Sequence, residues 1–106
     1  MKDFMTNQIQ FVGMKHDDRL ETSILEKLEK LEKKYEWIIN ARVFLKIEQS
    51  KDSIKDKVCE IELSVPGPNI FNKTSGEHFE AAIAEGFSDM EMLLRKFKGK
   101  MYRSTR

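Results

Sequence analysis

The last third of the chain carries an apolar stripe at helical spacing, and this stripe limits the folds open to the whole sequence. Its members follow one another at steps of three or four residues: Phe79, Ile83, Phe87, Met90, Leu94, Phe97 and Met101. The spacing predicts one long helix with one apolar face. Thr74 and Glu77 match the capping-box pattern, so the helix is expected to begin near Ser75. Such a helix has to lie against another apolar layer, and the small residues Ala82 and Gly86 beside the stripe would let a sheet approach closely.

Four segments alternate apolar and polar residues, which is typical of strands with one buried face. The clearest spans residues 38–49, and its expected buried positions are Ala41, Val43, Leu45 and Ile47. Residues 57–65 alternate in the same way, with Cys59 at an apolar position, so this thiol is expected to be a small buried group and not a nucleophile. Shorter strands are predicted at residues 8–13 and, after a Pro-Gly-Pro-Asn turn, at residues 70–73.

A second helix is predicted from about Arg19 to Tyr35. Asp17 or Asp18 is the expected N-cap, and Asp18 and Glu21 have capping-box spacing. The apolar face consists of Leu20, Ile24, Leu28, Leu31 and Tyr35. Lys27, Lys30 and Lys34 form a basic stripe, and Glu26, Glu29 and Glu32 lie close by. Glu and Lys side chains on a solvated helix also occur for solubility alone, so this stripe has two interpretations.

The predicted order is therefore β-α-β-β-β-α, which belongs to the α+β class. The simplest packing is a two-layer domain, with both helices on one face of a four-stranded mixed sheet. The first β-α-β connection is expected to be parallel and the later strands antiparallel. With 106 residues and no linker or repeat, the chain is expected to form a single domain over residues 1–106.

Charge is distributed unevenly along the chain. From Met92 onward there is no acidic residue but six basic ones, Arg95, Lys96, Lys98, Lys100, Arg103 and Arg106, and residues 99–106 form a basic tail. The remainder holds 13 basic and 18 acidic residues, so an overall charge of +1 hides an acidic body with a basic end. This asymmetry indicates a polyanionic partner for the end. The alternative is a solvated tail that opposes the helix dipole.

The sequence offers little for catalysis. His16 and His78 have no metal-ligand spacing to each other or to Cys59, and no nucleophile elbow or glycine-rich phosphate loop is present. We therefore expect no enzyme activity, no cofactor, no metal and no small-molecule substrate. The chain has neither a long apolar run nor an export signal, so an intracellular protein without a membrane partner is expected.

Several segments, in order, resemble one family, the ribosome hibernation-promoting factor or ribosome-associated inhibitor A (sigma-54 modulation protein) family. The resemblance covers roughly residues 8–101. The segments that carry it are residues 8–13 (QIQFVG), 29–35 (EKLEKKY), 43–48 (VFLKIE), 65–67 (VPG), 79–83 (FEAAI) and 94–98 (LRKFK). Each segment alone is a weak signal, but their joint order and spacing are fairly specific. The family's fold has the same β-α-β-β-β-α order.

The resemblance implies a cytoplasmic protein that binds the small ribosomal subunit and its rRNA in the channel for mRNA and tRNA. Such proteins inhibit translation by steric occlusion in starvation or stationary phase, as ribosome hibernation factors. Longer members add a C-terminal dimerisation domain. Because this chain ends at Arg106, it resembles the short type and is expected to be a monomer off the ribosome.

The resemblance also implies that helix lysines and arginines face rRNA phosphates. The residues expected first are Arg95, Lys96, Lys98 and Lys100, followed by Lys27, Lys30 and Lys34. This chain departs from the family at Asp89 and Met92, where basic residues are common, and at Phe97, where His or Tyr is common; the basic tail would compensate. Two alternatives remain open: a structured-RNA-binding module away from the ribosome, and a protein-protein adaptor.

Overall fold

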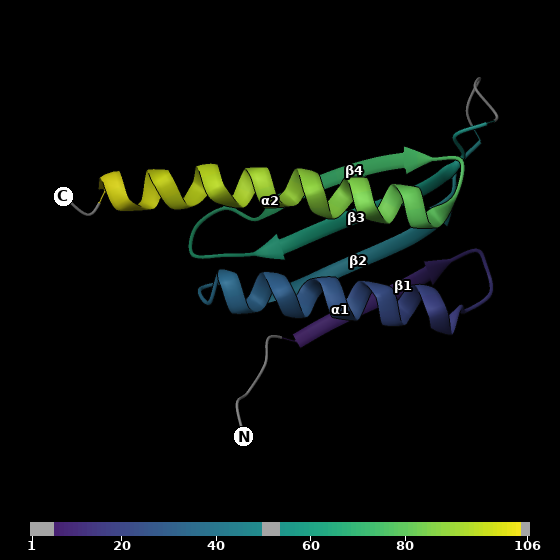
Figure 1. The fold of residues 1–106 in the computed structure, drawn as a ribbon, viewed down its shortest axis with the longest axis horizontal. Helices are drawn as coiled ribbons and strands as arrows, with labels where there is room; N and C mark the ends of the chain where they lie inside the picture. Colours follow the sequence, from purple (N-terminus) through teal and green to yellow (C-terminus); the bar gives the residue numbers. More distant parts are fainter. Residues whose placement is uncertain (1–5, 50–53, 105–106) are drawn as a thin grey trace.

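The computed structural model describes the backbone of residues 6–49 and 54–104. Its elements are β1 (Thr6–Val12), α1 (Asp18–Lys34), β2 (Asn40–Ile47), β3 (Lys57–Ser64), β4 (Ile70–Gly76) and α2 (Phe79–Ser104), as Figure 1 shows. The predicted β-α-β-β-β-α order is confirmed. Within the described ranges, neither helix has an apolar stretch that could cross a bilayer.

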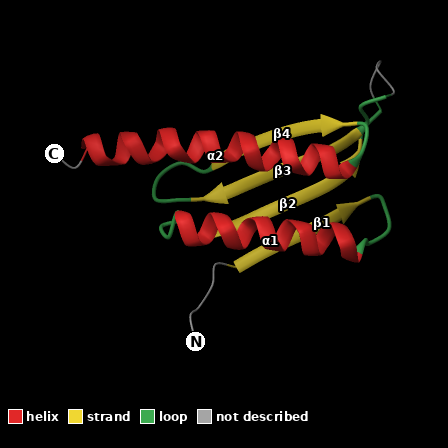
Figure 2. Cartoon of the chain, in the orientation of Figure 1, coloured by secondary structure: helices red, strands yellow, loops and turns green. Residues whose placement is uncertain are grey.

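The strands form one sheet in the order β1-β2-β3-β4. β1 pairs with β2 in parallel, and both β2–β3 and β3–β4 are antiparallel, as predicted. A turn with Gly67 at a φ of 108° joins β3 to β4, a backbone conformation that glycine adopts readily. α1 and α2 lie side by side on one face of the sheet (Figure 2), which leaves the other face open.

The core lies between the helices and the covered face of the sheet. Its members from the helices include Leu20, Ile24, Leu28, Leu31, Ala82, Ile83, Phe87, Met90 and Leu94. Its members from the sheet include Ala41, Val43, Leu45, Cys59, Ile61 and Leu63. These are the apolar positions that the two periodicities predicted, and Cys59 is fully buried as expected. Ile47 is an exception: it is 50% exposed, because it is the last residue of β2, where the chain leaves the sheet.

The predicted start of the long helix is wrong. Thr74 is not a cap but a residue of β4, which extends to Gly76 because its pairing with β3 continues to Lys57. The Thr74 hydroxyl donates to the carbonyl of Ala82 at 2.7 Å, so it joins the strand to the helix instead of capping a helix N–H. Cross-strand hydrogen bonds therefore prevail over the local capping pattern, and α2 begins only at Phe79.

Gly86 allows α2 to approach the sheet closely, as expected. A Cβ atom at this position would lie 3.1 Å from Thr74 Oγ1 and 3.2 Å from Ile61 Cδ1. Both distances are shorter than ordinary van der Waals contact, so any larger residue would push the helix or the strand aside.

Of the two residues proposed as the N-cap of α1, the structure shows Asp17 in this position. Asp17 is the N-cap, and its carboxylate accepts hydrogen bonds from the backbone N–H of Arg19 at 2.9 Å and of Leu20 at 3.2 Å. Asp18 is the first helical residue, so the capping box predicted for Asp18 and Glu21 does not form. Glu32 also differs from expectation, because it is 5% exposed instead of lying on the solvated face.

Candidate nucleic-acid interface

The open face of the sheet carries cations that are paired with carboxylates. The shorter ion pairs of this face are Arg42–Glu62, Lys46–Glu60, Lys46–Glu48 and Lys73–Glu48, and Lys73 also lies 4.0 Å from Glu60. The three shorter lysine contacts are 2.8, 3.2 and 3.1 Å long, respectively. Hydrogen bonds from Lys73 and Lys46 hold the pKa of Glu48 below its usual value. This face therefore presents mutually neutralised charges.

The side formed by the helices is different. Lys27 and Lys30 of α1 and Arg95 of α2 line a groove of about 370 Å³ between the two helices. Apolar side chains of Leu31, Phe87 and Met92 line the same groove, together with Ser88 and Glu91. Within the part of the chain that the structure describes, Lys27 and Lys30 form no ion pair. Two helices that are distant in sequence thus bring Lys27, Lys30 and Arg95 to one groove, where Arg95 acts on Glu91 and the two lysines have no carboxylate partner among the described residues.

Lys34, the third member of the basic stripe, is held in the helix packing. Its Nζ lies 2.9 Å from Glu91 Oε2, and the Tyr35 hydroxyl donates to the same oxygen at 2.7 Å. The hydrogen bond to Glu91 raises the pKa of Lys34, and the one from Lys34 lowers the pKa of Glu91. Burial is the main cause of the raised pKa of Tyr35. Lys34 therefore links α1 to α2.

The basic residues of α2 lie on two different flanks of the helix. Arg95 lines the groove, whereas Lys96 and Lys100, four residues apart on another flank, do not. Lys98 follows Arg95 by three residues and is partly buried. The basic tail continues α2 as far as Ser104, and the helix projects beyond the β3–β4 turn (Figure 1). The side chain of Arg103 and all of Arg106 lie outside the described residues.

Sequence reasoning missed the apolar part of the groove. Met92 is 52% exposed and lines the groove together with the basic residues, whereas the sequence indicated only the loss of a cation at this position. Phe97 instead packs against the ring of Trp37, with ring centroids 5.3 Å apart, and Trp37 in turn contacts Tyr35. The helical spacing predicted that Phe97 faces inward, but nothing in the sequence indicated its contact with Trp37.

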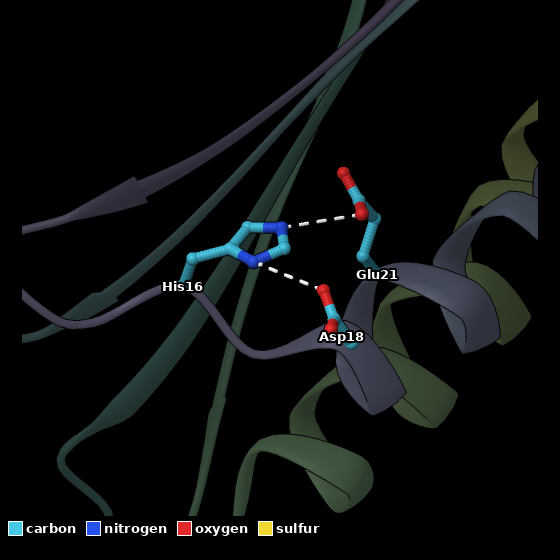
Figure 3. A group of neighbouring side chains, drawn as sticks. All are labelled: His16, Asp18 and Glu21. Atoms are coloured by element: carbon cyan, nitrogen blue, oxygen red, sulfur yellow. Dashed lines mark hydrogen bonds and ion pairs between the residues drawn. The ribbon is translucent and has the colours of Figure 1, made fainter.

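His16, Asp18 and Glu21 form an exposed cluster at the start of α1 (Figure 3). Nδ1 of His16 lies 3.2 Å from Asp18 Oδ1, and Nε2 lies 3.2 Å from Glu21 Oε1. Each ring nitrogen thus faces a different carboxylate. A metal ion needs one ring nitrogen lone pair with both carboxylates turned toward it, whereas here the two carboxylates face different ring nitrogens, so we assign no metal to this cluster.

Cys59 offers no nucleophile. The side chain is fully buried between the sheet and α2, and this burial raises the pKa of its thiol to about 12. The thiolate is the reactive form of cysteine, so the group is inert at neutral pH.

Comparisons with known proteins agree with this fold. Over residues 7–102 the chain matches the family described as Sigma 54 modulation protein / S30EA ribosomal protein. A ribosomal subunit interface protein from Coxiella burnetii superposes with a TM-score of 0.76 at 18% identity, covering 88% of this chain and 97% of that protein. The Protein Y N-terminal domain from Thermus thermophilus superposes with a TM-score of 0.71 at 18% identity, covering 90% of this chain and 99% of that domain. No curated protein sequence matches the chain significantly. The match over nearly the whole domain shows that the chain belongs to the Sigma 54 modulation protein / S30EA ribosomal protein family, whose members are ribosome-associated.

Proposed function

We propose that the chain binds the small ribosomal subunit with the side formed by α1 and α2 and occupies the channel for mRNA and tRNA. The action is steric, because a bound protein excludes both RNAs and keeps an idle ribosome out of translation. Starvation or stationary phase is the proposed setting. The residues proposed to face rRNA phosphates are Lys27, Lys30, Arg95, Lys96, Lys98 and Lys100, with Lys34 contributing least because it is already ion-paired with Glu91.

The unequal pairing of charge on the two sides of the domain carries this proposal. A cation already bound to a carboxylate gains little from a phosphate, because the first ion pair must be broken. Lys46 and Lys73 of the open sheet face are in this state, whereas Lys27 and Lys30 have no carboxylate partner among the described residues. When lysines and arginines neutralise RNA phosphates, counterions held by the RNA are released, and this release drives binding. Cations without a carboxylate partner are available for this exchange, which favours the helix side.

Co-sedimentation with isolated small subunits, with and without bound mRNA and tRNA, tests the proposal. We expect binding to the empty subunit and loss of binding when tRNA and mRNA are present. Binding that tRNA does not affect would move the site away from the channel. Absence of binding at low salt would reject the ribosomal function and favour a protein-protein adaptor.

Two double variants with equal changes in net charge identify the binding side. Lys27→Gln/Lys30→Gln should weaken binding to the subunit about tenfold or more, since each lost phosphate contact removes a share of the electrostatic affinity. Lys46→Gln/Lys73→Gln on the open sheet face is the matched control and should bind like the unmodified protein. Equal losses in both variants would mean that net charge alone, and not the helix side, determines binding.

A further inference from the structure

The groove between α1 and α2 has an apolar floor inside a basic rim. Leu31 and Phe87, which are 4% and 7% exposed, form the lower part, and Met92 stands above them with 52% exposure. Lys27, Lys30 and Arg95 line the same groove. Its volume of about 370 Å³ falls at the lower end of the ~300–1,000 Å³ range of ligand pockets.

Phosphates alone do not account for this composition. A phosphate needs cations and hydrogen-bond donors, and the apolar side chains of Leu31, Phe87 and Met92 supply neither. An exposed methionine beside unpaired lysines instead provides a flexible, polarisable surface for a flat apolar partner. The ligand that fits both parts is one that joins an apolar ring to an anion.

We propose that this groove holds one unstacked nucleotide of single-stranded RNA, with its base against Met92 and the apolar floor and its flanking phosphates at Lys27, Lys30 and Arg95. The inference rests on the proposed RNA-binding side and adds the chemical class that this side selects. Bases in a duplex are stacked on both faces and cannot enter a groove, whereas bases of loops, bulges and ends can be splayed out. The site therefore favours unpaired RNA over duplex RNA.

Glu91 does not oppose the phosphates, because its charge is already compensated. Lys34 and Tyr35 both bind its Oε2 atom. Glu91 and Ser88 also line the groove, and side-chain oxygens of these residue types can hydrogen-bond to polar atoms on the edge of a base. The groove thus supplies an apolar surface, hydrogen-bonding groups and cations, as the three parts of a nucleotide require.

Methyl NMR of methionine-labelled protein tests the proposal directly. The ligands are a single-stranded RNA pentamer and an abasic ribose-phosphate pentamer of the same charge. We expect the pentamer with bases to bind about 5- to 10-fold more tightly than the abasic one and to shift the Met92 methyl signal upfield through the ring current of the base. The methyl of Met90, which is fully buried in the same helix, is the internal control and should move little.

Variants separate the base from the phosphates. Met92→Ala should weaken binding of the pentamer with bases until the two pentamers bind with nearly equal affinity. The affinity for the abasic pentamer should stay unchanged. Met92→Leu should retain the preference, because leucine preserves the apolar surface. Lys27→Gln/Lys30→Gln should weaken the binding of both pentamers by the same factor. A hairpin duplex without unpaired bases should give no upfield shift of Met92.

The outcomes distinguish this inference from the proposed function. Equal affinity for the two pentamers without a Met92 shift overturns the nucleotide site, even if the protein sediments with small subunits. A preference for bases that Met92→Ala does not reduce also overturns it. Conversely, a protein that prefers the pentamer with bases, with the shift at Met92, but does not bind subunits retains the nucleotide site and loses the ribosomal function.

Discussion

The Tyr35 hydroxyl donates a 2.7 Å hydrogen bond to Glu91 Oε2, which joins the C-cap of α1 to the middle of α2. Lys34 reaches the same oxygen at 2.9 Å, so the last residue of α1 and its C-cap together hold one carboxylate of α2. Glu91 lines the groove between the helices. This contact therefore sets the relative position of the two helices that carry the proposed interface.

Glu91→Gln should reveal the contribution of this contact through its pH dependence. Because the folded-state pKa of Glu91 is lowered, first by the hydrogen bond from Lys34, its stabilising effect is present above the unfolded-state pKa of about 4.3. It is lost as the pH falls through the folded-state pKa. We expect the variant to be less stable than the unmodified protein at pH 7 and the two to converge in acid, measured by urea unfolding. Glu85→Gln, the same substitution at an exposed residue of α2, is the control and should leave the stability at pH 7 nearly unchanged.

Tyr35→Phe isolates the neutral donor of the same contact. It removes the hydroxyl but keeps the ring, which is 2% exposed and packs against Trp37. The free energy of unfolding should fall by about 1 kcal/mol, the usual net value of one hydrogen bond. Denaturant unfolding followed by the fluorescence of Trp37 measures it. A change near zero would mean that water replaces the hydroxyl without loss.

Two glycines of α2 should respond in opposite ways to alanine. Gly86→Ala places a Cβ 3.1 Å from Thr74 Oγ1 and 3.2 Å from Ile61 Cδ1, and both neighbours are buried. Overpacking of about 1–3 kcal/mol should exceed the gain in helix propensity. A Cβ at Gly99 would have no neighbouring atom within 4 Å, so Gly99→Ala should raise the free energy of unfolding by about 0.5–1 kcal/mol. Thermal unfolding of both variants checks the pair, and stabilisation by Gly86→Ala would contradict the close approach.

Cys59 should be inert to thiol reagents while the protein is folded. With a thiol pKa of about 12, roughly 10⁻⁴ of the groups are ionised at pH 8, and the side chain is fully buried. We expect the sole cysteine to be modified only at the rate of unfolding and at once in denaturant. Rapid modification of the folded protein would show that α2 opens locally from the sheet.

Salt should weaken binding to the ribosome steeply. If about five phosphates are contacted, log K should fall with log salt at a slope of about −4 to −5. Lys27→Gln/Lys30→Gln should make the slope shallower by about 2, because two phosphate contacts are removed. Lys46→Gln/Lys73→Gln should leave it unchanged. A shallow slope for the unmodified protein would argue against phosphate contacts as the source of affinity.

The spacing of apolar residues correctly predicted those structural properties that depend on residues close together along the chain. Steps of three and four residues identified both helices and their buried faces, and alternation identified the strands, including the buried position of Cys59. Thr74 shows the limit of this reasoning. Its spacing to Glu77 satisfies a capping pattern, yet pairing of β4 with β3 places it in a strand, and pairing depends on residues that are distant in sequence.

The amino-acid sequence by itself determined the order of elements, their apolar faces and the basic stripe of α1, because these follow from local periodicity. Only the tertiary structure decided that Lys27 and Lys30 share a groove with Met92 and Arg95, and that Lys34 bonds to Glu91. More than 50 residues separate these partners along the chain. Their meeting depends on how the two helices align on the sheet, which is set by packing at Gly86 and by the core between the layers.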